Sequence, residues 1–201
     1  MNSAPFLSIL PMITIISMVG AFSFGVAAHV LRRELDPIAM PFSAYLSGAS
    51  RWIGLACYAC LTSGIAVFAI AAVFRFGLDA GTGGASALFV VSIVLVAIAA
   101  ATARADAPLA IDDPKIRLLH RWSAFFAFLS AVAAIAVDTY AWRAQQSLHG
   151  VWNWMAGLSG ALVVLFAILS FVTPAFKGAV QKLLMFGIVV WFVAVAVTMR
   201  Y

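Results

Sequence analysis

The chain alternates long apolar runs with short polar segments, and six such runs follow one another from end to end. Each is about twenty residues long, the length that a helix needs to cross the hydrocarbon core of a bilayer. Runs of this length are too long for barrel strands, and lipid excludes irregular backbone with unpaired hydrogen-bonding groups. The pattern therefore predicts an all-α, polytopic membrane protein, a six-helix bundle with short loops in a single domain over residues 1–201. The predicted spans are Phe6–Val30, Trp52–Phe74, Ala85–Ala103, Trp122–Tyr140, Val151–Val172 and Ala179–Met199.

Composition supports lipid as the solvent. The chain is 65% hydrophobic and only 9% charged, whereas soluble domains carry about 25% charged residues. A soluble fold of this size could not hide so much apolar surface. The net charge of +5 does not indicate nucleic-acid binding, because the sequence has no basic run with interleaved aromatic residues. We therefore expect the lipid bilayer as a partner and no nucleic acid.

The basic residues predict an orientation. Nine of the twelve Lys and Arg residues follow spans one, three and five, and three lie on the other side. By the positive-inside rule the richer side faces the cytoplasm. We expect a multi-pass protein of the cell inner membrane, with loops 1–2, 3–4 and 5–6 cytoplasmic and both termini outside. The nine are Arg32, Arg33, Arg51, Arg104, Lys115, Arg117, Arg121, Lys177 and Lys182, and the three are Arg75, Arg143 and Arg200.

Several local patterns have structural interpretations. Trp142, Trp152 and Trp154 flank the loop between spans four and five, which is typical of an interfacial aromatic belt. The segment GTGGAS, Gly81–Ser86, lacks the Lys-Ser/Thr of a phosphate-binding loop and is interpreted as a flexible turn. Small residues spaced four apart within residues 156–161 predict close packing of helix backbones.

The two cysteines, Cys57 and Cys60, lie within the second apolar run. Their C-Y-A-C spacing resembles a redox motif. Burial in an apolar run favours ordinary packing residues instead, and a thiol role is the alternative.

The most polar segment is DDPKIRLLHRWSAFFAF, Asp112–Phe128. Asp113 suits a helix N-cap and Pro114 suits the first helical position. In a helix that begins there, Asp113 and Arg117 are four residues apart and can pair. Asp112 and Asp113 could serve only as capping residues.

His120 lies seven residues after Asp113, about 10 Å further along the same helix. A partner for His120 must therefore come from another segment, unless the side chain only extends towards the membrane surface. The candidates are Ser43, Tyr45, Glu34 and Asp36.

Three arginines near this end are candidates for binding an anion. Arg117 and Arg121 share a helix face with His120, and Arg51 begins the second span. Guanidinium groups suit phosphate or carboxylate, and a lipid headgroup is the nearest abundant anion. Alternatively these arginines only set the orientation of the protein in the membrane.

We expect no metal and no cofactor. A metal site needs three or four ligands, which His29, His120 and an Asp could supply only through tertiary structure. Heme would need His29 and His120 at a similar depth on facing helices.

Asp138 lies near the far end of the fourth span. An ionisable group at membrane depth is a functional candidate. Pairing with Arg143, five residues later, is the alternative.

Three segments resemble one bacterial six-helix membrane family, catalogued as domain of unknown function 998. MPFSAYLSGASRWIGLACYACL resembles its Pro-x-Ser signature after the first span, and DDPKIRLLHRWSAFFAF resembles its Asp before a Leu-His. GAVQKLLMFGIVVWFVAVAV resembles its final span, Gly-x-x-Gln-(Lys/Arg)-Leu. The similarity covers about His29 to Met199 and implies no established reaction. It implies that two loops form one site, with recurrent polar positions at Ser43, Gly48, Asp113 and His120.

These features favour a non-enzymatic subunit or a lipid- or small-molecule-binding component of a membrane assembly, with a membrane-protein partner or a second copy. The alternative is a membrane-embedded enzyme acting on a lipid or isoprenoid. There Ser43 or His120 would move protons, Asp113 would orient, and Arg117 or Arg121 would hold an anionic group. A small transporter is a second alternative.

Overall fold

The computed structural model describes residues 6–46, 48–103, 113–145 and 148–200. Within these ranges the chain is helical and contains no strand, and six helices are long and apolar enough to cross a membrane. The predicted all-α class is therefore confirmed. The long helices are α1 (Phe6–Leu31), α2 (Arg51–Phe76), α3 (Ala80–Thr102), α4 (Pro114–Ala141), α5 (His149–Phe171) and α6 (Pro174–Thr198), and the short 3-10 helices are η1 (Phe42–Leu46) and η2 (Trp142–Ala144).

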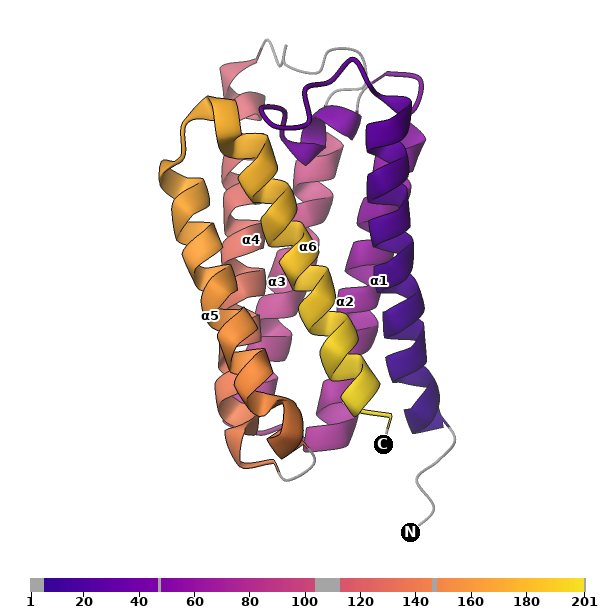
Figure 1. Cartoon of the computed structure of the whole chain (residues 1–201), viewed down its shortest axis with the longest axis vertical. Coiled ribbons are helices and arrows are strands. Elements are labelled where there is room, and N and C mark those ends of the chain that lie inside the picture. Colours follow the sequence, from indigo (N-terminus) through magenta and orange to yellow (C-terminus); the bar gives the residue numbers. More distant parts are fainter. Residues whose placement is uncertain (1–5, 47, 104–112, 146–147, 201) are drawn as a thin grey trace.

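The six helices form a closed ring in which each packs on the next, and α6 returns to α1 (Figure 1). Helices α2, α4 and α6 bury the largest share of their residues. One end of the bundle carries η1 and the starts of α4 and α6, and is called the η1 end. The opposite η2 end carries the start of α1 and the end of α6 (Figure 1).

Helix α4 begins eight residues before the predicted span. Asp113 is its N-cap, and the carboxylate accepts a 2.8 Å hydrogen bond from the amide of Lys115. Pro114 occupies the first turn, as predicted. Asp112 and Arg104 lie outside the described residues.

The prediction of a turn at Gly81–Ser86 is wrong, because these residues form the first turns of α3. Asp79 caps that helix, and its carboxylate accepts a 2.7 Å hydrogen bond from the amide of Thr82. A Cβ at Gly81 would lie 2.5 Å from the Cβ of Ala141. The glycine therefore allows close approach of α3 and α4 rather than a flexible turn.

An aromatic core fills the η2 end around Phe68, whose ring lies 4.7 Å from that of Phe192. Trp142 belongs to this core. It is 1% exposed, and its indole N–H donates to the Thr82 hydroxyl at 3.1 Å, so the prediction that it belongs to an interfacial belt is wrong. Trp152 is half-buried and Trp154 is 53% exposed.

At the η1 end, the start of α6 holds the chain that leads into η1. The Lys182 ammonium donates to the carbonyls of Pro37 (2.5 Å) and Met40 (2.8 Å). The Gln181 side-chain oxygen accepts from the amide of Phe42 at 2.9 Å, and the amide of Ala179 donates to the carbonyl of Ile38 at 2.8 Å. We call these contacts the α6 clasp. They pair backbone groups of the loop that have no partner within a helix.

Gly178 makes the α6 clasp possible. A Cβ there would lie 2.2 Å from the carbonyl oxygen of Met40 and 2.7 Å from that of Ile38. Both are backbone atoms, so the loop would have to move. The small residues of α5 differ, because a Cβ at Gly157 or Gly160 would meet nothing within 4 Å. Within this chain, these two glycines therefore do not make the close helix packing that the sequence predicts.

We predict that Gly178→Ala destabilises the protein, because the new methyl group displaces the loop that α6 holds. Overpacking of this kind lowers the free energy of unfolding by about 1–3 kcal/mol. In a protein of this size, a loss of about 2 kcal/mol lowers the unfolding midpoint by about 4–8 °C. Thermal unfolding in detergent measures the effect. Gly157→Ala is the matched control and leaves the midpoint unchanged or slightly raised. Equal midpoints for the two variants would contradict this role of Gly178.

Candidate functional site

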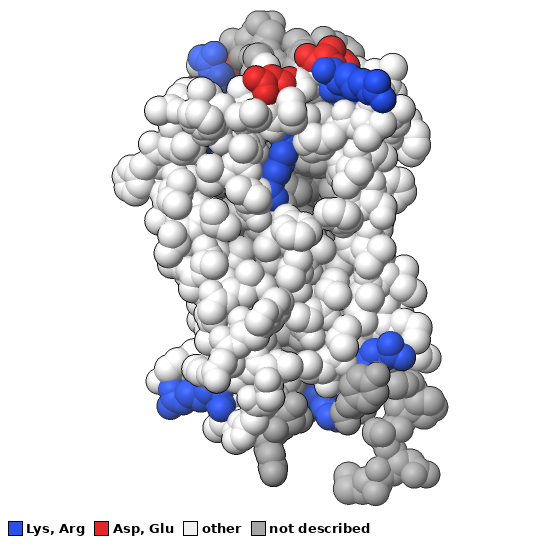
Figure 2. Space-filling view, in the orientation of Figure 1, with Lys and Arg blue, Asp and Glu red and all other residues white. Residues whose placement is uncertain are grey.

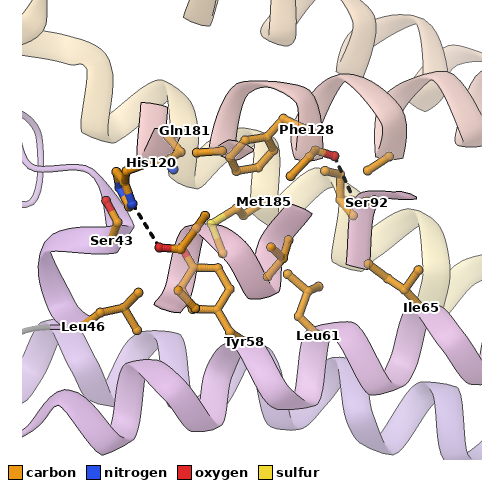
Figure 3. Close-up of a pocket in the computed structure, with 17 residues that line it drawn as sticks. Ser43, Leu46, Tyr58, Leu61, Ile65, Ser92, His120, Phe128, Gln181 and Met185 are labelled. Carbon is orange, nitrogen blue, oxygen red and sulfur yellow. Dashed lines mark hydrogen bonds between the residues drawn. The ribbon is translucent and has the colours of Figure 1, made fainter. Parts of the chain in front are cut away.

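Two of the cavities at the η1 end are lined by polar as well as apolar side chains. The first, called the inner chamber, is bounded by η1, α2, α3, α4 and α6 and has a volume of about 40 Å³. Ser43, His120 and Gln181 line one side of it, and the remaining lining is mostly apolar (Figure 3). The second, called the lateral groove, runs between α1 and α6 with a volume of about 570 Å³.

His120 is anchored to the preceding helix. Its Nδ1 lies 3.0 Å from the carbonyl oxygen of Ala99 and 3.3 Å from the Thr102 hydroxyl. Since a carbonyl only accepts, Nδ1 donates, and Nε2 of the neutral ring is left as an acceptor. The hydrogen-bonding partner does lie on another segment, as predicted, but on α3 rather than in the α1–α2 loop. Because α3 packs tightly on α4, the carbonyl of Ala99 lies within hydrogen-bonding distance of the ring.

The inner chamber brings together Ser43 and His120, 77 positions apart in the sequence (120 − 43). Figure 3 shows both side chains at the same end of the chamber, near Gln181. Gln181 was missing from our site candidates, although the Gly-x-x-Gln-Lys spacing of the final span was visible. That spacing places Gln181 and Lys182 one turn after Gly178, where they meet the loop.

The other site candidates lie outside the chamber lining. Asp113 is exposed and uses its carboxylate to cap α4. Arg51, Arg117 and Arg121 are also exposed. The pairing of Asp113 with Arg117 does not form, because among the described residues only Arg32 and Glu34 make an ion pair.

Within the described residues, none of the remaining candidates hydrogen-bonds to His120. Glu34 and Asp36 are bonded elsewhere, and the buried Tyr45 hydroxyl has no hydrogen-bond partner. The hydrogen bond from Arg32 lowers the pKa of Glu34, and Asp36 accepts from the amide of Ile38 at 2.7 Å. Tyr45 is 1% exposed and stacks on the ring of His29, with 4.6 Å between centroids. Burial raises the pKa of its hydroxyl.

The lateral groove has one polar end. His29 and Lys182 line it there, and the rest of the lining is almost entirely apolar. Figure 2 shows a basic side chain recessed in the otherwise uncharged face below the η1 end. Lys182 makes no ion pair within the described part of the chain. The groups nearest its charge are two backbone carbonyls and the Tyr45 ring, whose centroid lies 5.5 Å from the ammonium, and Asp36 acts on it from beyond ion-pair distance.

His29 is also held by its own helix. Its Nδ1 donates to the carbonyl of Gly25 at 2.8 Å. This leaves Nε2 as the ring nitrogen that can accept a hydrogen bond. Over the residues that the structure describes, no three His, Cys, Asp or Glu side chains group as metal ligands. The absence of metal and heme stays a prediction.

Asp138 is buried at the η2 end, 1% exposed, and its Oδ1 has no hydrogen-bond partner. The expected alternative, pairing with Arg143, does not occur. Arg143 is exposed and stacks its guanidinium on the Tyr140 ring at 4.0 Å.

Both cysteines are free, and the Cys57 thiol donates to the carbonyl of Ala21 at 3.1 Å.

The fold defines a six-helix membrane protein. The chain belongs to the family described as "Protein of unknown function (DUF998)", whose model matches residues 15–198. This confirms the family resemblance of its three segments. No curated protein and no solved structure matches the chain.

We predict that Asp138→Asn unfolds at the same temperature as the wild type or a higher one. A buried carboxylate with an unpartnered oxygen is costly, and a neutral isostere removes that cost. Thermal unfolding in detergent measures it. Asp113→Asn is the control, since Asn also caps helices well. A loss of more than about 2 kcal/mol in Asp138→Asn alone would show that the charge is stabilising.

Proposed function

We propose that this protein binds an anionic single-chain or acyl lipid in the lateral groove between α1 and α6. The observation that carries the proposal is a long apolar groove that ends at one recessed ammonium group, Lys182. An apolar cavity with a few placed polar groups is the usual form of a small-molecule site.

The dimensions suit an extended hydrocarbon chain. The α1 residues that line the groove run from Ala21 to Val30, and the α6 residues run from Ala179 to Val189. At 1.5 Å per residue the groove extends about 14 Å along the helices. Its polar end lies at the η1 end and its apolar end points towards the middle of the bundle. A lipid of the adjacent leaflet has the same orientation, with its headgroup at the surface and its tail inward.

The charge selects an anionic headgroup. Two of the three N–H groups of Lys182 donate to Pro37 and Met40, and carbonyl dipoles do not cancel a full charge. His29 adds a ring nitrogen beside it. A phosphate or carboxylate oxygen is the acceptor that matches the remaining N–H. If the η1 end faces the cytoplasm, as the positive-inside rule predicts, anionic lipids are abundant on that side.

An enzyme acting on a lipid is the weaker candidate. The inner chamber brings Ser43 near His120, but Asp113, Arg117 and Arg121 are exposed and do not line it. The proposed orienting and anion-holding groups therefore do not meet the candidate proton carriers. A role as a subunit of a larger assembly is compatible with lipid binding, and the identity of a partner stays a prediction.

We predict that Lys182→Gln lowers the preference for anionic over zwitterionic lipid. A lysine near an anionic lipid contributes about 1 kcal/mol, so the ratio of bound lipids falls about fivefold. Native mass spectrometry of protein from mixed-lipid nanodiscs measures the ratio. Lys177→Gln is the matched control, because Lys177 lies on the same helix but is exposed outside the groove. An equal decrease in both variants would indicate nonspecific charge attraction and would overturn the proposal.

We also predict that Gly25→Leu removes most of the retained lipid of either charge. A Cβ at Gly25 lies 3.8 Å from Cys57 and from Phe42, an ordinary contact distance, so the longer side chain enters the groove without moving the backbone. Gly157→Leu on the open face of α5 is the control. Unchanged lipid retention in Gly25→Leu would show that the bound lipid lies elsewhere.

A further inference from the structure

The inner chamber and the lateral groove share a wall. Leu61 of α2 and Met185 of α6 line both cavities. Leu61 is buried, whereas Met185 is only half-buried. A methionine side chain is unbranched and rotates about three bonds. Of the two shared residues, Met185 is therefore the one whose rotation we expect to join the cavities.

The chamber contains hydrogen-bonding groups that have no partner among the described residues. Gln181 accepts through its oxygen from Phe42, which leaves its side-chain NH₂ as a donor. His120 donates through Nδ1 to Ala99, which leaves Nε2 as an acceptor. The Ser43 hydroxyl can do either. No Asp, Glu, Lys or Arg lines the chamber.

This set of groups matches one hydroxyl. A hydroxyl donates one hydrogen bond, to His120 Nε2, and accepts one, from Gln181 or Ser43. The apolar lining around Phe128 covers the attached carbons. A volume of about 40 Å³ holds only the end of a molecule, so a longer chain must extend past Met185 into the groove.

We propose that the inner chamber is a second ligand site, which binds the hydroxyl end of a neutral aliphatic alcohol that enters from the lateral groove past Met185. This site is chemically distinct from the cationic end at Lys182. Entry of the alcohol depends on the wall that the two cavities share, and the site does not require that an anionic lipid binds in the groove.

Cysteine accessibility tests the site. The background is Cys57→Ser with Cys60→Ala, in which the serine keeps a donor for the carbonyl of Ala21.

The reporter is Ser92→Cys, because Ser92 lines the chamber, is 2% exposed and does not line the groove. Ala124→Cys, on the chamber wall formed by α4, is the second reporter if the first fails to fold. Ser130→Cys is the control, since Ser130 is buried outside both cavities.

The measurement is the rate of modification by methyl methanethiosulfonate, with 1-octanol or n-octane as the competing probe. We expect 1-octanol to protect the reporter about fivefold better than n-octane, the factor that one neutral hydrogen bond contributes. Ser43→Ala reduces that difference. Met185→Ala accelerates modification of the reporter in the absence of a probe and leaves the control unchanged.

Three results would overturn the proposal: equal protection by 1-octanol and n-octane, equal protection of Ser130→Cys, or no acceleration by Met185→Ala. Octanoate separates the two sites in the same protein, because a carboxylate suits Lys182 but has no O–H to donate to His120 Nε2. We expect octanoate to protect the reporter less than 1-octanol does. Protection by octanoate equal to that by 1-octanol would show a single site at the lysine and would also overturn the proposal.

Discussion

The architecture of the η1 end depends on the hydrogen bonds by which α6 holds the chain that leads into η1. Three backbone carbonyls between α1 and η1 accept from α6, at Pro37, Ile38 and Met40. The same contacts have two consequences. They fix η1, and with it Ser43, over the inner chamber, and they draw the Lys182 ammonium below the surface to the end of the lateral groove. The α6 clasp therefore accounts for both cavities.

The two ends of the bundle differ in packing. Around Phe68 and Trp142 the η2 end is filled by interlocking aromatic rings. The η1 end combines the directional hydrogen bonds of the α6 clasp with a smaller cluster of rings around Tyr45, and it leaves space between helices. Close packing gives the η2 end rigidity, while the space at the η1 end leaves room for a ligand. The division suggests a stable half that supports a binding half.

Much of the fold could be predicted from the sequence. Apolar run length fixes the number of helices, and Asp113 with Pro114 fixes the start of α4, because both signals are local. The partner of His120 could not be predicted, since it depends on which face of α4 packs against α3. The burial of Trp142 was missed for the same reason. An aromatic residue at the end of a span has the same local pattern whether it meets lipid or the core.

Lys182 shows what a local rule leaves out. Its position counts towards the positive-inside rule, but its depth follows from Gly178 and from the length of the loop that α6 holds. An experimental density map of the wild-type protein in nanodiscs with anionic and zwitterionic lipids tests most directly whether this ammonium ends a lipid-binding groove. We predict elongated density in the lateral groove whose polar end contacts Lys182 Nζ. A lateral groove without such density, or a carboxylate of the protein on Lys182, would contradict the proposal.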